Sequence, residues 1–191
     1  FDYSGNLLSS FDLPATYTIE AWIYPTVLDE TWQRLVLRWQ GAFSYHFALR
    51  QIGTDWTVSL FHQEAGGVQP NANGGSVVLG QWQHIAGVAD GSMIRVYLDG
   101  QEVNSVPYDG TITGATGVGL GLGDMASGNG LRFNGYIDEL AMWSLPLTPE
   151  EILSHYASGA NGYGLEIAPP TPQVAGDCNQ DGQRGIADLV C

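Results

Sequence analysis

The stretch that decides the fold is RVYLDGQEV, residues 95–103 of a 191-residue chain. Two short runs that contain β-branched or aromatic residues flank the dipeptide Asp99-Gly100. A two-residue hairpin turn needs positive φ at its central positions, and Asp-Gly tolerates that conformation well. The stretch therefore predicts a tight hairpin of two antiparallel strands.

Similar short runs repeat on both sides of this hairpin, separated by glycine-containing turn signals. This pattern is typical of an all-β chain folded as an antiparallel two-sheet sandwich or a closed barrel. We expect Pro25 to end the first strand and residues 71–75, NANGG, to form a loop. The expected strands are residues 16–24, 34–39, 45–50, 56–61, 82–89, 94–98, 117–122 and 136–143.

One segment after these strands predicts a short helix. Thr148 is a good N-cap, Pro149 suits the first helical position, and Glu151 stands three residues after the cap. Together they form a capping box, which satisfies backbone N–H groups that a helix start leaves unpaired. Gly159 is expected to end the helix. The residues expected to pack inward are Ile152, Leu153 and Tyr156.

The composition describes a globular, acidic chain, with 44% apolar and 14% charged residues. Six arginines, no lysine and 20 acidic residues leave a formal charge of -14. We expect no nucleic-acid partner, because phosphate binding requires clustered basic side chains. We expect no membrane insertion, because no run approaches the roughly 20 apolar residues of a spanning helix. Residues 1–5 already read as a strand, so we expect a piece of a longer protein.

Composition divides the chain into three parts. Residues 1–164 hold the expected strands and the helix. Residues 165–175 contain APPTP and form a proline-rich linker, because such a segment is stiff and cannot join a sheet. Residues 176–191 form a short tail with its own motif. One main domain with a small appendage is therefore expected.

Five motifs resemble, in their order, the concanavalin A-like jelly rolls of the laminin-G type. The resemblance implies two curved antiparallel sheets of about a dozen strands, in modules that bind glycans or proteins outside the cell. It also suggests a structural calcium at Asp138 together with Asp2, although Asp138 bonded only to backbone amides stays equally open. The motifs are YTIEAWIYP at 17–25, WQHIAGV at 82–88, RVYLDG at 95–100, FNGYIDEL at 133–140 and LTPEEI at 147–152.

The tail carries the motif with the most explicit chemistry, DCNQDGQRGIAD at residues 177–188. Oxygen-bearing side chains stand at loop positions 1, 3, 5 and 12, with glycine at position 6, as in an EF-hand loop. A hard cation needs six to eight oxygen ligands, so the motif predicts a Ca²⁺ site. Asp177, Asn179 and Asp181 would supply side-chain oxygens, Gln183 its backbone carbonyl, and Asp188 a bidentate carboxylate.

Aspartate at position 12 makes this loop resemble a dockerin repeat. Arg184 and Gly185 depart from that pattern, and a dockerin pairs two loops where this chain has one. A cohesin-type partner is therefore expected only for a complete dockerin. Cys178 and Cys191 would form a disulfide in an oxidising compartment, or stay free; the spacing leaves both open.

Nothing in the sequence predicts an enzyme. Retaining glycosidases of this sandwich fold need two carboxylates about 5 Å apart, usually from alternating acids on one strand. Asp138 and Glu139 are adjacent and are expected on opposite faces. The four histidines are scattered along the chain and are expected to be structural: His46, His62, His84 and His155.

We therefore predict a non-catalytic, extracellular binding module of a larger secreted bacterial protein, with a glycan or an extracellular protein as its partner. A structural spacer or adhesin repeat, or an accessory domain of a polysaccharide-degrading enzyme, are the alternatives. Exposed tryptophans would stack on sugar rings. Trp32, Trp39 and Trp56 are the candidates outside the resemblance motifs, although packing under loops is also open for them. Those inside the motifs are expected to be core: Trp22, Trp82 and Trp143.

Overall fold

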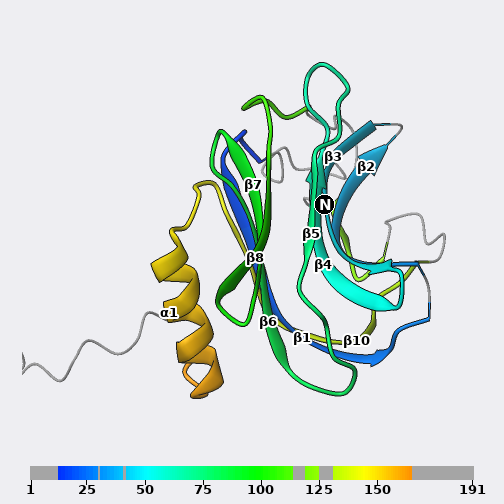
Figure 1. The fold of residues 1–191 in the computed structure, drawn as a ribbon, viewed down its shortest axis with the longest axis vertical. Coiled ribbons are helices and arrows are strands. Elements are labelled where there is room, and N and C mark those ends of the chain that lie inside the picture. The colour runs from blue at the N-terminus through cyan, green and yellow to red at the C-terminus, as the bar shows by residue number, and fades with distance from the viewer. Residues whose placement is uncertain (1–12, 30, 41, 114–118, 125–130, 165–191) are drawn as a thin grey trace, which may run out of the picture.

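A computed structural model describes residues 13–29, 31–40, 42–113, 119–124 and 131–164. These residues form two five-stranded sheets that face each other, with one helix outside them (Figure 1). Every pairing between the named strands is antiparallel. The jelly-roll sandwich expected from the sequence is confirmed.

The first sheet, called sheet A, holds the first and the last named strand. It has the strand order β10-β1-β6-β7-β8, so the first and the last strand of the fold lie side by side. Its strands are β1 (Tyr17–Val27), β6 (Gln83–Ala89), β7 (Met93–Leu98), β8 (Gln101–Pro107) and β10 (Asn134–Trp143).

The second sheet, sheet B, has the strand order β5-β4-β3-β2-β9. Four of its strands, β2 to β5, follow one another along the chain as in a meander. Strand β9 comes after three strands of sheet A in the sequence and pairs with β2. Its strands are β2 (Trp32–Gln40), β3 (Ala42–Ile52), β4 (Asp55–His62), β5 (Asn71–Gly74) and β9 (Gly121–Leu122).

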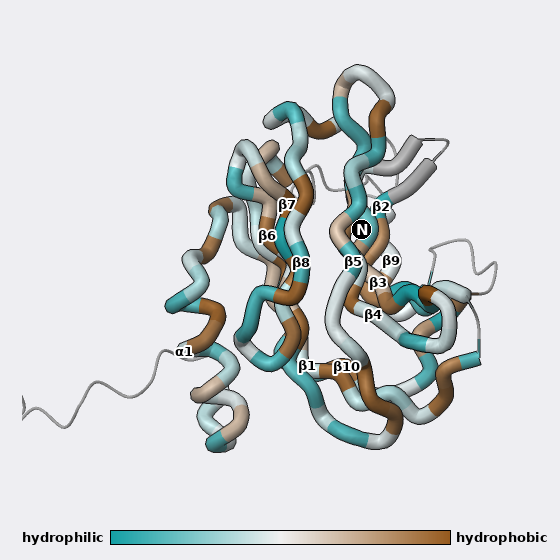
Figure 2. Tube along the Cα trace, in the orientation of Figure 1, coloured by the Kyte–Doolittle hydropathy of each residue, from teal (hydrophilic) through white to brown (hydrophobic). Residues whose placement is uncertain are grey.

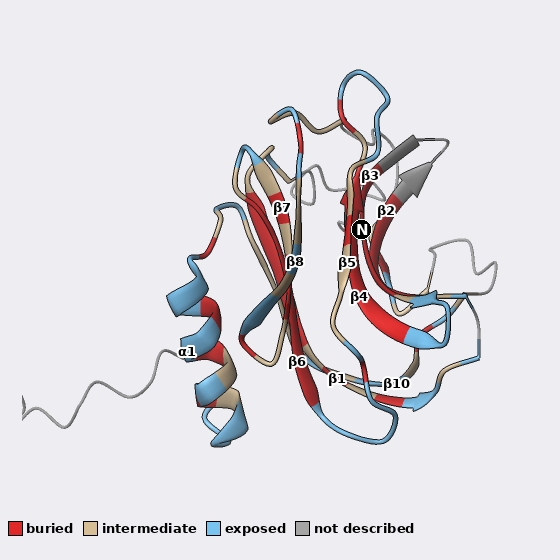
Figure 3. Cartoon of the chain, viewed as in Figure 1, coloured by how far each residue is buried: buried red, intermediate tan, exposed pale blue. Residues whose placement is uncertain are grey.

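The hydrophobic core fills the space between the two sheets. Side chains alternate along a strand, so one face of each sheet can supply apolar residues to this space. Apolar residues (brown) recur along the strands of both sheets (Figure 2). The central strands β1, β6, β3 and β4 are the most buried (Figure 3). Residues buried on the inner faces include Tyr17, Ile19, Ile23, Phe47, Leu49, Leu60, Ile85, Ile94 and Val96.

Helix α1 (Pro149–Ala160) packs against the outer face of sheet A (Figure 1). The predicted capping box is present: the Thr148 hydroxyl accepts a hydrogen bond from the Glu151 N–H, and the Glu151 carboxylate accepts one from the Thr148 N–H. The helix ends at Ala160 with Asn161 as its C-cap, one residue later than predicted. A second, small apolar cluster lies beneath the helix and contains Ala86, Val88, Tyr97, Leu147 and Ile152.

The Asp99-Gly100 hairpin is confirmed, because both residues have positive φ, 49° and 76°. Two other expectations are wrong. Pro25 does not end β1, which continues to Val27; a register irregularity between Pro25 and Val27 accommodates the missing N–H. The expected loop at Asn71–Gly74 is strand β5, because its backbone pairs with β4.

Candidate functional site

Three rows of side chains cross the outer face of sheet A. Strand register places directly opposite residues on the same face, so the row of Trp22 includes His84 of β6 and Asp138 of β10. Two residues earlier along β1, Glu20 lies opposite Ala86 and Ala141. Two residues later, Tyr24 lies opposite Tyr136. Helix α1 covers the first two rows in part and leaves the third open.

The open row consists of Trp82, Tyr24 and Tyr136, and is called the aromatic row. The ring centroids are 5.7 Å apart for Trp82 and Tyr24 and 6.0 Å apart for Tyr24 and Tyr136, both in edge-on contacts. Trp82 is 47% exposed and Tyr136 is 63% exposed. With Thr26, these rings line a shallow hollow of about 500 Å³. Aromatic surface is thus held in a fixed arrangement and presented to solvent.

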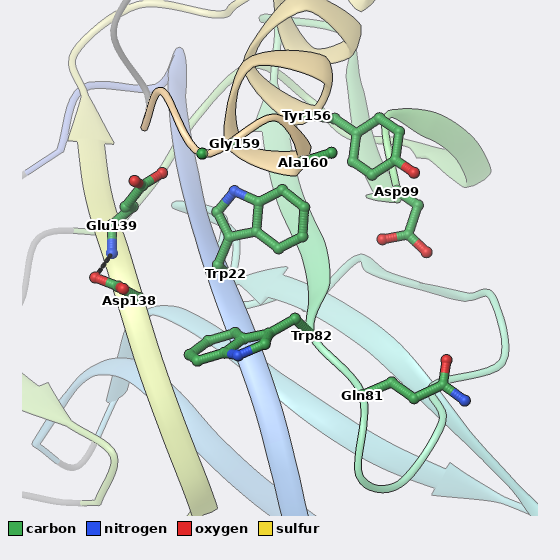
Figure 4. A pocket seen from close by; sticks show the side chains of 10 residues that line it. Trp22, Gln81, Trp82, Asp99, Asp138, Glu139, Tyr156, Gly159 and Ala160 are labelled. Carbon is green, nitrogen blue, oxygen red and sulfur yellow. Dashed lines mark hydrogen bonds between the residues drawn. The ribbon is translucent and has the colours of Figure 1, made fainter.

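A larger cleft of about 630 Å³ adjoins the aromatic row and shares Trp82 with it. We call it the acidic cleft. Trp22 lies in its middle and stacks on Tyr156 of α1, with centroids 5.8 Å apart. Asp138 and Glu139 lie on one side of Trp22 and Asp99 on the other (Figure 4). The lining residues are Trp22, Gln81, Trp82, Asp99, Asp138, Glu139, Tyr156, Gly159, Ala160 and Gly162.

Asp138 and Glu139 both line this cleft, although alternation along a strand predicted opposite faces for them. The reason is a bulge: the register between β1 and β10 shifts between Glu20 and Trp22, and Glu139 has a φ of 51°. The Asp138 carboxylate accepts a hydrogen bond from the Glu139 N–H at 2.9 Å. Backbone strain of this kind is concentrated at functional sites in proteins.

A polar cluster around Glu20 lies beneath α1. Glu20 is fully buried and accepts hydrogen bonds from Nε1 of Trp143 at 2.7 Å and from Nδ1 of His155 at 3.0 Å. Nε2 of His84 lies 3.4 Å from its other oxygen. Burial by itself raises the pKa of Glu20, but the bonds and charges of His84 and His155 outweigh burial and lower it below 4.5. The cluster joins α1 to β1, β6 and β10, and its members Glu20 and His84 have no exposed surface.

The histidines are buried, as the sequence predicted. Burial lowers the pKa of His46 to about 3 and that of His62 to about 4, so both are neutral near pH 7. Nδ1 of His62 lies 3.1 Å from the Tyr17 hydroxyl. The other two belong to the Glu20 cluster.

The tryptophans divide differently from the prediction. Trp56 is 8% exposed and belongs to the core, and Trp32 is stacked between His46 and the guanidinium of Arg50. The side chain of Trp39 lies outside the described residues. Trp82, expected in the core, is instead exposed in the aromatic row. Trp22 lines the acidic cleft.

No group of three or more His, Cys, Asp or Glu side chains in the described part of the chain is arranged to hold a metal ion. Asp138 accepts a hydrogen bond from a backbone amide, which agrees with the second of the two alternatives for this residue, a carboxylate bonded to backbone amides. Asp2 lies outside the described residues. So do both cysteines and the five predicted calcium ligands of the tail, Asp177, Asn179, Asp181, Gln183 and Asp188.

The fold defines a two-sheet antiparallel β-sandwich module. The chain belongs to the family described as Laminin_G_3, of the concanavalin A-like lectin/glucanases superfamily, whose model matches residues 3–153. Among the described residues, no helix is long and apolar enough to cross a membrane.

Solved structures with the same fold include three from different settings. The sialidase module CBM40 of Ruminococcus gnavus, bound to α2,3-sialyllactose, is 19% identical with a TM-score of 0.59, over 76% of this chain and 84% of that one. Domain 4 of a Geobacillus stearothermophilus arabinanase, in complex with arabinotriose, is 24% identical with a TM-score of 0.55, over 75% and 67%. A Limulus polyphemus pentraxin is 16% identical with a TM-score of 0.55, over 79% of both chains.

Proposed function

We propose that this chain is a non-catalytic glycan-binding module and that the aromatic row is its binding surface. The observation that carries the proposal is the exposure of Trp82 and Tyr136 on either side of Tyr24, on a part of the outer face of sheet A that α1 does not cover. Apolar side chains gathered on a surface mark interaction sites. Aromatic rings are suited to the C–H faces of sugars, with their polar atoms left for hydroxyl groups.

The structural neighbours support a glycan over a protein as the partner. Two of them are modules with an oligosaccharide bound, sialyllactose in one and arabinotriose in the other. One is a module of a sialidase and the other a domain of an extracellular arabinanase, which fits the alternative of an accessory domain. A secreted bacterial setting is part of the proposal.

The positions and burial of the carboxylates support the proposal that the module is not catalytic. Glu20 has no exposed surface, so no substrate reaches it. Asp138 and Glu139 are neighbours on one side of the cleft and so cannot act as a pair across a scissile bond, which needs a general acid on one side and a base or nucleophile on the other. One oxygen of Asp99 is engaged by the His84 N–H at 2.9 Å, which holds this carboxylate in the β7–β8 turn.

The test is binding of a glycan panel by the full chain and by Trp82→Ala. An aromatic residue at the centre of an interface contributes about 2 kcal/mol or more, so affinity should fall roughly 30-fold, measured by calorimetry. Trp32→Ala is the matched control, because Trp32 is a partly exposed tryptophan on the other sheet. Equal loss in both variants, or no loss in Trp82→Ala, would overturn the aromatic row as the site. An adhesin or spacer would bind no glycan at all.

Calcium binding by residues 177–188 is a separate proposal, supported by the spacing of the oxygen ligands alone. Asp188→Ala should abolish the calcium-induced rise in melting temperature of the full chain, because it removes the bidentate ligand. Asp138→Ala should leave that rise intact. The reverse result would move the metal to the sandwich.

A further inference from the structure

The acidic cleft carries negative charge on its wall. Three carboxylates line it, and no lysine or arginine is present among the described residues that form its wall. They come from two elements far apart in the sequence, the β7–β8 turn and strand β10, and they flank Trp22 on both sides (Figure 4). A ligand that reaches from the aromatic row toward Trp22 therefore meets negative charge on both sides.

Two of these carboxylates are oriented by the backbone. One oxygen of Asp99 accepts the His84 N–H, and one oxygen of Asp138 accepts the Glu139 N–H, each at 2.9 Å. Within the described chain, the second oxygen of Asp99 and that of Asp138 carry no hydrogen bond. A carboxylate oxygen is an acceptor only, so these atoms suit hydroxyl donors.

We propose, building on the proposed function, that the acidic cleft selects neutral glycans and rejects glycans that carry carboxylates. Sugar rings stack along the aromatic row, and hydroxyl groups at one end donate to Asp99 and Asp138 beside Trp22. A uronate carboxylate in the same position finds like charges and, among the described residues that line the cleft, no positively charged donor. Repulsion is strong in a partly enclosed cleft, where water screens it weakly. The net charge of -14 adds repulsion at longer range.

The experiment compares matched pairs of glycans on the full chain. Gluco-, galacto- and mannotetraose are measured by calorimetry, each beside the same oligosaccharide after oxidation of its C6 hydroxyls to carboxylates. We expect the oxidised partner of the best ligand to bind at least tenfold more weakly. Added salt should narrow this difference, because it screens the repulsion.

Two variants assign the selectivity to the cleft. Asp138→Asn with Glu139→Gln keeps the side-chain shapes but removes two charges, so the penalty for the oxidised glycan should shrink several-fold. Asp138→Asn alone serves if the double variant does not fold. Asp55→Asn, an exposed carboxylate on sheet B, is the matched control and should leave the penalty unchanged.

The outcomes separate the two proposals. Equal affinity for both members of a pair, or tighter binding of the oxidised member, would overturn the selectivity and leave glycan binding standing. If neither Asp138→Asn nor its combination with Glu139→Gln reduces the penalty for the oxidised glycan, the role of the cleft in the selectivity is overturned. Absence of binding to every neutral and oxidised glycan would overturn selectivity and function together.

Discussion

On one half of the outer face of sheet A, Glu20 lies fully buried beneath α1; on the other half, four residues further along the same strand, Tyr24 lies in the exposed aromatic row. Both side chains point outward by the same alternation. The difference lies in helix α1. It packs over Glu20 and supplies His155 as its hydrogen-bond partner, whereas Tyr24 is not covered by the helix. The helix, as much as the sheet, therefore decides which part of this face is open to a ligand.

The largest effect is expected from Glu20→Gln, which acts on the covered half. The substitution removes the charge that the buried partners of Glu20 are arranged around. Removing one member of a buried charged pair lowers the free energy of unfolding by about 3 kcal/mol or more. Urea denaturation should show this loss in the free energy of unfolding, whereas Asp55→Asn should stay within about 0.5 kcal/mol of wild type. A loss as small as that of the control would show that the cluster does not hold α1 in place.

A smaller effect is expected from Gly159→Ala, at the border between the two halves. A Cβ at Gly159 would lie 2.6 Å from Cε2 of Trp22, so either the helix or the indole must move. Such overpacking costs about 1–3 kcal/mol, and it should weaken glycan binding by displacing Trp22. Thermal melts and calorimetry measure both changes. Gly66→Ala is the control, because nothing lies within 4 Å of a Cβ there.

A loss of about 1 kcal/mol is expected from Thr148→Ala, which removes the N-cap of α1. The cap stabilises the helix far from the aromatic row, so glycan affinity should not change. Thr148→Ser retains the hydroxyl and should retain stability. A change in affinity for the alanine variant alone would show that the two halves are coupled through the whole helix.

The smallest and most specific effect is expected in acid. The pKa of Glu20 is lowered in the folded chain, so its contribution to stability is complete above pH 4.5 and is lost as the pH falls through the lowered value. Burial lowers the pKa of His46 and His62 in the folded chain. Below pH 6.5 the unfolded chain binds protons at these histidines that the folded chain does not, so the free energy of unfolding falls further. Glu20→Gln should remove only the part of the pH dependence of stability that lies below pH 4.5. Parallel stability curves for wild type and variant would contradict this assignment.

Much of the fold could be predicted because its signals are local. The hairpin at Asp99-Gly100 and the capping box at Thr148 depend on residues within four positions of each other, and both are confirmed. Strand β5 was missed because residues 71–74 carry no apolar alternation; pairing with β4 alone makes them a strand. Pro25 misled because a bulge in β1 accommodates it.

The candidate site was mostly out of reach of the sequence. Trp82, Tyr24 and Tyr136 are neighbours only through the register of three strands, and Trp82 stands inside a motif typical of the core. Tyr24 offered the one available signal, since it follows Trp22 at a spacing of two on the face opposite Ile23. The bulge at Glu139 likewise has no mark in the sequence.

By itself, the sequence determined short antiparallel strands with one short helix, because alternation, turn residues and caps act between near neighbours. The choice of a two-sheet sandwich over a closed barrel rested on the family resemblance. Only the tertiary structure decided which outward-facing aromatic and acidic side chains meet, which of them α1 covers and which stay open. Those outcomes depend on strand register and on helix placement, which bring together residues more than a hundred positions apart.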